Sequence, residues 1–214
     1  LKANPARDAE GAVVESKMEP GRGSVATILI QHGTLKVGDI FVVGTESGTV
    51  RALINDNGDQ IKEAAPGLPV EVLGLTGTPE AGDIFNVVED DARAREIADF
   101  RLRQKKDKQA AAITGRSFED LLSAAKDGEK QTLPVLIKGD VHGSVEAIIG
   151  SLNKLTEDND EVAIQVLHSG VGGITESDVT LAGASNALII GFNVRANAQA
   201  RTAAERDGLS MRYY

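Results

Sequence analysis

The spacing of apolar residues changes once along the chain, and this change limits the fold more than any other feature. Up to residue 91, short runs rich in Val and Ile are separated by Gly, Pro, Asn and Asp. From residue 132 onward, unbroken apolar runs alternate with segments of helical spacing. The first pattern is typical of an antiparallel barrel and the second of a parallel sheet. The sequence therefore predicts two domains of different architecture.

Residues 1–91 are predicted to form an antiparallel β-barrel. The runs expected to be strands are 11–17, 24–32, 39–44, 48–54, 69–75 and 83–88. Turn residues such as Asp56-Asn57-Gly58-Asp59 stand between them. Short strands at close spacing, each ended by turn chemistry, close more readily into a barrel than into an open sheet.

Residues 92–130 are predicted to be a connecting helix and linker. In the stretch 89–108 acidic residues come first and basic residues last, which suits the helix dipole. Only a narrow apolar stripe recurs at helical spacing, formed by Ala94, Ile97, Ala98 and Leu102. A second, short helix is expected to begin at Ser117 and to end at Gly128.

Residues 131–214 are predicted to form a three-layer α/β/α domain with a four-stranded parallel sheet. Expected strands are 133–138, 162–168, 187–192 and 209–213, and expected helices are 144–155, 175–185 and 197–207. Apolar strands without alternation are buried on both faces, so helices are expected on both sides of the sheet.

Composition excludes several kinds of function. The chain of 214 residues has no Cys, which rules out disulfides and thiolate chemistry and agrees with a cytoplasmic location. Its net charge is −9, and residues 1–91 hold 7 basic and 15 acidic residues. Broad, non-specific binding of nucleic acid is therefore not expected, and no apolar run is long enough to predict a membrane span. The chain begins at Leu1, so we expect a fragment.

Catalytic chemistry is not predicted at any of the suggestive motifs. The glycine-rich turn 169–175 lacks the third glycine of the dinucleotide fingerprint, and the chain has no Gly-Lys-Ser/Thr of a P-loop. Asp140 with His142, or His168 with Ser169, could be an acid/base or nucleophile pair, but neither has an orienting partner in the sequence. The three histidines are scattered, so no metal site is predicted.

Basic residues in the barrel are the remaining candidates for binding. Lys17, Arg22 and Lys36 flank turns, and Arg51 stands on a strand. Arg22 lies between two glycines, which let a partner approach closely while the guanidinium offers a fork for phosphate. We predict an RNA contact at Arg22, with Lys17 and Lys36 nearby.

Several motifs carry a resemblance to a known family. Residues 21–27 (GRGSVAT) followed by 33–39 (GTLKVGD) resemble the second-domain barrel of translational GTPases. Residues 137–147 (IKGDVHGSVEA), 168–178 (HSGVGGITESD) and 191–196 (GFNVRA) are similar to the bacterial initiation-factor-2 family within that group. That family usually has Gln where this chain has His142. The matches extend over nearly the whole chain and are weakest at 106–130.

The resemblance implies a parent protein that binds GTP and magnesium, promotes binding of formylmethionyl initiator tRNA to the small ribosomal subunit, and promotes subunit joining. The GTP site would lie before Leu1 and the tRNA-binding domain after Tyr214. The chain itself is then expected to be a monomer without catalytic, metal or cofactor-binding residues. It would dock on small-subunit RNA and link the adjoining GTPase domain to the distal tRNA-binding domain.

Two alternatives stay open at this stage. The chain could be part of another translational GTPase, although an α/β domain after the barrel disfavours the elongation type. It could also be a nucleotide-dependent α/β enzyme domain fused to a barrel, which the missing phosphate-binding loops disfavour.

Overall fold

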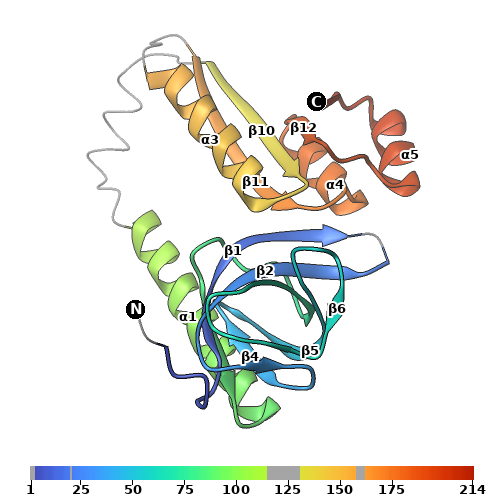
Figure 1. The fold of residues 1–214 in the computed structure, drawn as a ribbon. Coiled ribbons are helices and arrows are strands. Elements are labelled where there is room, and N and C mark those ends of the chain that lie inside the picture. Colours follow the sequence, from blue (N-terminus) through green and yellow to red (C-terminus); the bar gives the residue numbers. More distant parts are fainter. Residues whose placement is uncertain (1–2, 20, 115–130, 158–161) are drawn as a thin grey trace. The chain divides into compact units, whose positions relative to one another are not determined.

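A computed structural model describes residues 3–19, 21–114, 131–157 and 162–214 (Figure 1). The chain divides into two compact units, Leu1–Gly115 and Arg116–Tyr214. Each unit has its own apolar core, so each is described by itself.

The first unit contains a closed antiparallel barrel, as the sequence predicts. Its six main strands are β1 (Glu10–Glu19), β2 (Gly23–His32), β4 (Ile40–Val43), β5 (Glu46–Ile54), β8 (Pro69–Leu75) and β9 (Ile84–Val88). They follow the order β4-β9-β1-β2-β8-β5, and pairing of β5 with β4 closes the ring. Three two-residue strands were not predicted: β6 (Gln60–Ile61) pairs antiparallel with the end of β5, and β3 (Leu35–Lys36) pairs with β7 (Glu63–Ala64).

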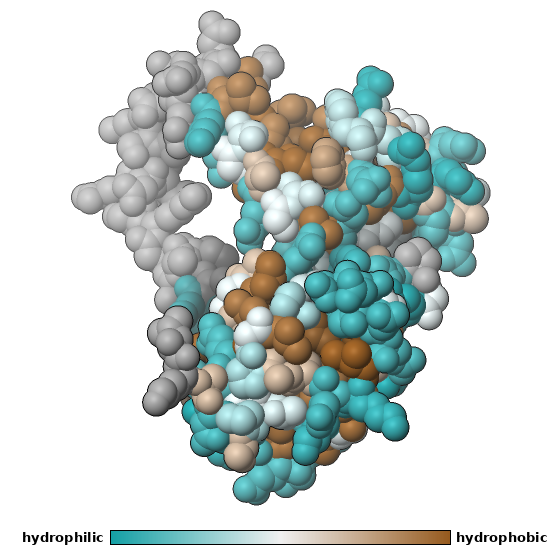
Figure 2. All heavy atoms as spheres, in the orientation of Figure 1, coloured by the Kyte–Doolittle hydropathy of each residue, from teal (hydrophilic) through white to brown (hydrophobic). Residues whose placement is uncertain are grey.

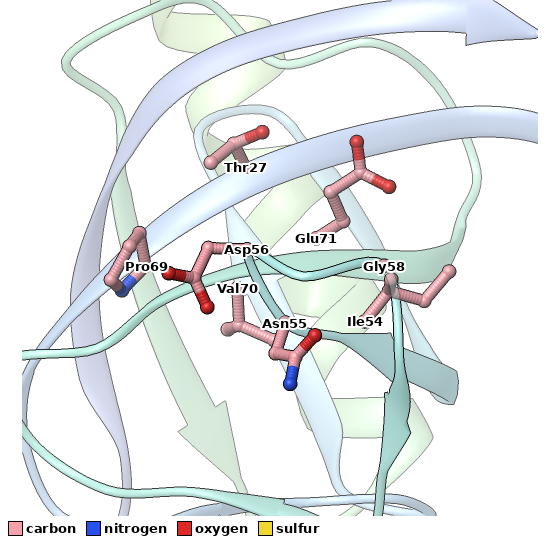
Figure 3. A pocket seen from close by; sticks show the side chains of 8 residues that line it. All are labelled: Thr27, Ile54, Asn55, Asp56, Gly58, Pro69, Val70 and Glu71. Atoms are coloured by element: carbon pink, nitrogen blue, oxygen red, sulfur yellow. The ribbon is translucent and has the colours of Figure 1, made fainter.

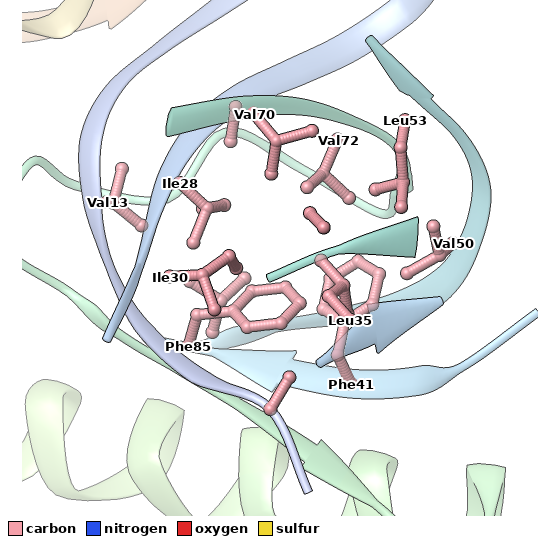
Figure 4. Close-up of a cluster of buried hydrophobic side chains, with 14 residues drawn as sticks. Val13, Ile28, Ile30, Leu35, Phe41, Val50, Leu53, Val70, Val72 and Phe85 are labelled. Atoms are coloured by element: carbon pink, nitrogen blue, oxygen red, sulfur yellow. The ribbon is translucent and has the colours of Figure 1, made fainter. Parts of the chain in front are cut away.

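Aromatic and β-branched side chains fill the barrel interior (Figure 4). The rings of Phe41 and Phe85 are fully buried and stack with 4.7 Å between their centroids. On β2, Ala26, Ile28 and Ile30 are buried at every second position. Over this part of β2, the period of two places one face of the strand in the core and the other toward the surface.

Helix α1 (Asp91–Thr114) belongs to the same unit as the barrel. Ala94 and Ala98 of the predicted stripe are buried, and Leu102 is exposed. In addition to these apolar contacts, α1 makes two polar contacts with the barrel. The Arg101 guanidinium donates a hydrogen bond to the carbonyl oxygen of Gly44 at 3.0 Å, and the Lys105 amine forms an ion pair with the Glu80 carboxylate at 2.5 Å. Both apolar and polar contacts therefore hold this helix against the barrel. The helix expected at 117–128 lies outside the described residues.

The second unit is an α/β/α domain with a four-stranded parallel sheet, as predicted. Its strands are β10 (Gln131–Gly139), β11 (Val162–Val171), β12 (Leu188–Phe192) and β13 (Met211–Tyr213), in the order β11-β10-β12-β13. Its helices are α3 (His142–Glu157), α4 (Glu176–Ala184) and α5 (Ala198–Asp207).

Apolar side chains cover both faces of this sheet. Val145 of α3 packs with Val135 and Ile137 of β10. Leu136, which points to the other face, packs in a cluster with residues of α4 and α5. Such double coverage explains why these strands read as continuous apolar runs. Among the described helices, none combines the length and the apolar character that a membrane span requires.

Candidate nucleic-acid interface

The turn between β1 and β2 presents Arg22 on a glycine-framed loop. Gly21 and Gly23 have φ angles of 81° and 79°, a region that favours glycine. The Arg22 N–H donates a hydrogen bond to the carbonyl oxygen of Glu19 at 3.2 Å, which closes the turn. A Cβ atom built on either glycine would meet no atom within 4 Å. The space beside Arg22 is therefore open to a partner.

Two predicted contact residues, Lys17 and Arg22, meet in a ring of ion pairs with two glutamates. Lys17 lies 2.9 Å from a carboxylate oxygen of Glu19 and 3.0 Å from one of Glu71. Arg22 lies 2.5 Å from Glu19 and 3.4 Å from Glu71. Each cation thus contacts both carboxylates. We call Lys17, Glu19, Arg22 and Glu71 the hairpin ring.

Strand pairing places Glu71 in this ring although it is far away in the sequence. Glu71 on β8 is opposite Thr27 on β2, and Lys17 on β1 is opposite Val25 on β2. Val25 and Thr27 are two residues apart, so their side chains lie on the same face of the strand. The pairing order β1-β2-β8 therefore brings Lys17 and Glu71 together on the outer face of the barrel.

The ring favours the charged forms of Lys17 and Glu19. Hydrogen bonds to Glu19 and then to Glu71 raise the pKa of the Lys17 amine above its ordinary value. The hydrogen bond from Lys17 is the main cause that lowers the pKa of the Glu19 carboxyl. All members are about one quarter to one third exposed, so solvent screens these interactions. With two positive and two negative groups, the hairpin ring has no net charge.

The other two predicted contact residues, Lys36 and Arg51, lie outside the ring. Lys36 is on β3. This strand follows the end of β2 at His32, whereas the turn with Arg22 precedes the other end of β2, and Lys36 is opposite Glu63 of β7 in the strand register. Its N–H donates a hydrogen bond to the Asp39 carboxylate at 2.8 Å. Arg51 is exposed on β5, where the pairing with β8 is irregular. The structure therefore groups Lys17 with Arg22, and the expectation that Lys36 lies nearby is wrong.

A hollow of about 320 Å³ adjoins Glu71 on the side toward the turn after β5 (Figure 3). Asn55, Asp56 and Glu71 are among its lining residues, together with apolar atoms of Ile54, Pro69 and Val70. None of the residues that line it is basic. Carboxylates repel phosphate, so the hollow itself does not suit an RNA backbone.

An apolar row crosses the outer face of the barrel. Ala12 on β1 is opposite both Ile84 on β9 and Leu29 on β2, and Leu29 is opposite Pro69 on β8. Ile84 is 56% exposed and Leu29 is 37% exposed. On the face of the molecule in Figure 2, hydrophobic side chains lie among hydrophilic ones on the barrel. This row offers contact area but no attraction for phosphate.

The motifs considered for catalysis in the second unit make structural contacts within that domain. The Asp140 carboxylate accepts hydrogen bonds from the N–H of Val141 and, at 2.6 Å, from the Asn193 amide. The imidazole of His168 lies 3.9 Å from a carboxylate oxygen of Asp178. These contacts do not assemble the base and nucleophile geometry that a triad requires. The described residues contain no cluster of His, Asp and Glu able to hold a metal ion.

The glycine-rich turn expected at 169–175 is shorter in the structure, because Ser169, Gly170 and Val171 belong to β11 and pair with β10. The N–H of Gly172, whose φ is 100°, donates a hydrogen bond to the carbonyl oxygen of Gly139 at 2.8 Å. Thr175 and Asp178 then form a capping box at the start of α4. The backbone and caps of this turn are therefore engaged within the domain.

Comparison with known proteins gives matches along the chain. A family described as Translation-initiation factor 2 matches residues 106–214, and one described as Elongation factor G domain 2 matches residues 8–88. A protein named translation initiation factor IF-2 from Paramagnetospirillum magneticum is 60% identical over 214 residues, covering 100% of this chain and 24% of its own length. The protein of that name from Agrobacterium fabrum is 58% identical over 216 residues, with coverages of 100% and 23%.

A solved structure supports the fold. GDP-bound aIF5B from Aeropyrum pernix aligns with a TM-score of 0.52 and 22% sequence identity, covering 100% of this chain and 35% of that one. At this identity the likeness concerns the fold alone. The chain spans about a quarter of the length of the curated relatives that it matches.

Proposed function

The chain belongs to the Translation-initiation factor 2 family, and we propose from this membership that it is the non-catalytic middle of a translation initiation GTPase. Its barrel would dock on the small ribosomal subunit. Its α/β/α domain would couple a GTPase domain to a distal domain that binds initiator tRNA. The observation that carries the proposal is 60% identity to an initiation factor along the whole chain.

The parent protein would promote binding of formylmethionyl initiator tRNA and joining of the ribosomal subunits. One observation supports this assignment of partners: the curated relatives are named translation initiation factors. GTP and magnesium would bind in the GTPase domain of the parent, and this chain would act as a monomer in the cytoplasm.

We expect this chain alone neither to bind nor to hydrolyse GTP. The physical reason is that no Gly-x-x-x-x-Gly-Lys-Ser/Thr loop is present in its sequence to surround the phosphates and hold magnesium. Isothermal titration with GTP and magnesium measures this directly. Saturable binding in the micromolar range would contradict the proposal and favour a nucleotide-dependent enzyme domain.

Docking should depend on Arg22. The Arg22→Ala substitution is expected to weaken binding of the chain to isolated small subunits and to lower the salt slope by about one unit, because one phosphate contact is lost. The measurement is a binding titration across a series of salt concentrations. Arg103→Ala is the matched control, since Arg103 is an exposed arginine on α1. Loss of binding in the control, with Arg22→Ala unchanged, would move the contact to the helix.

A further inference from the structure

The four ion pairs of the hairpin ring are not equivalent. Three of them join at 2.5, 2.9 and 3.0 Å, while the pair between the Arg22 Nη2 atom and Glu71 is 3.4 Å long. Charge-assisted hydrogen bonds of full strength are close to 2.8 Å. The Arg22–Glu71 contact is therefore the weak edge at which this ring opens most easily.

We propose that Glu71 is a competing counter-ion for Arg22, and that an RNA phosphate takes its place on the guanidinium when the barrel docks. This inference rests on the proposed function, and it assigns different roles to two glutamates of one cluster. Glu19 is a positioning residue that holds Arg22 toward the partner. Glu71 balances the charge of Arg22 until phosphate arrives.

The geometry of Arg22 supports an exchange on one side only. Its Nη1 atom contacts Glu19 at 2.5 Å, and its Nη2 atom contacts Glu71 at 3.4 Å. A guanidinium presents its donors in a planar fork, so one side can stay bound while the other changes partner. The Arg22 backbone N–H is also bound to Glu19, which keeps residue and partner within one turn.

Glu71 would not be left alone after the exchange. Its other carboxylate oxygen accepts a hydrogen bond from the Lys17 amine at 3.0 Å. Glu71 is held on β8 by the ladder to β2, so the carboxylate cannot follow Arg22 out of the ring. Arg22 is 36% exposed on a turn with open space on both sides, and it is the member that can move.

Selectivity would follow from the neutral ring. A cluster without net charge on an acidic barrel has little long-range attraction for RNA in solution. Phosphate displaces Glu71 only when it is brought directly to the turn, as happens on a docked ribosomal surface. The ring therefore opposes binding to free RNA and permits one oriented contact.

Two substitutions with the same change of charge separate these roles. Glu71→Gln should tighten binding of the chain to small subunits by about two- to fivefold at low salt, which corresponds to one exposed ion pair, and should steepen the salt slope. Glu19→Gln should leave affinity unchanged or reduce it, because Arg22 loses its positioning partner. Glu15→Gln, an exposed glutamate on β1 outside the ring, controls for net charge.

A third experiment tests whether the effect of Glu71→Gln on affinity depends on Lys17 and Arg22. In a Lys17→Ala/Arg22→Ala background, Glu71→Gln should change affinity no more than Glu15→Gln does. Equal tightening by Glu71→Gln and Glu19→Gln, or weaker binding by Glu71→Gln, would overturn the inference. If Arg22→Ala alone leaves the affinity of the native chain unchanged, the docking site itself is wrong, whatever Glu71→Gln does.

Discussion

The Phe85→Ala substitution is expected to lower the free energy of unfolding of the barrel by about 3–5 kcal/mol. Phe85 is fully buried and stacks on Phe41, so alanine removes a whole ring from a closed interior. Cavities in such interiors collapse only partly, which adds to the lost transfer free energy. Chemical denaturation followed by far-UV circular dichroism measures the change.

A matched control for Phe85→Ala is available on the same unit. Phe100 on α1 is 59% exposed, so Phe100→Ala should change stability by no more than about 0.5 kcal/mol. We also expect Phe85→Ala to shift one of two unfolding transitions, because the two units have separate cores. A single transition that shifts as a whole would show that the units unfold together.

The Asp178→Ala substitution is expected to destabilise the α/β/α domain by about 3–5 kcal/mol. Asp178 is 6% exposed, and one of its carboxylate oxygens lies 3.5 Å from the Lys138 amine, which is also buried. The same carboxylate accepts hydrogen bonds from the N–H and hydroxyl of Thr175, each at 2.8 Å. Alanine would leave a buried ammonium without its counter-ion and would remove half of the capping box.

A double-mutant cycle separates the lost ion pair from the lost cap. Asp178→Asn keeps an oxygen that can accept from Thr175 but removes the charge. Adding Lys138→Met should recover part of the loss, because the unpaired charge is then gone. The measurement is the free energy of unfolding of the α/β/α domain, taken from the unfolding transition that Phe85→Ala does not shift. If the double variant is no more stable than Asp178→Asn alone, the ion pair is not the source of the effect.

The apolar pattern was sufficient to predict both architectures. The period of two in a strand and the capping residues of a helix, such as Thr175 and Asp178, are patterns within a few residues of sequence, so they can be read from the sequence directly. Very short strands such as Leu35–Lys36 were missed, because two residues carry no period. The domain boundaries at 91 and 130 stay predictions, and the structure joins α1 to the barrel unit.

The candidate site was predicted only in part. Arg22 and Lys17 were found from the glycines and turn beside them, which are local signals. Their contacts with Glu71 were missed because Glu71 is 49 residues from Arg22 in the sequence. Alternation along β8 could have placed Glu71 on the outer face, but it could not have shown which strand lies beside it.

The sequence by itself determined the main strands, the helices α1, α3, α4 and α5, and the family, since each depends on local periodicity or on motifs read in order. Only the tertiary structure decided that Lys17 and Arg22 share their charge with Glu19 and Glu71, and that Lys36 lies elsewhere. The physical reason is that barrel closure pairs strands in the order β1-β2-β8, which differs from their order in the chain. Electrostatic neighbours on an outer face are set by that pairing and by its register.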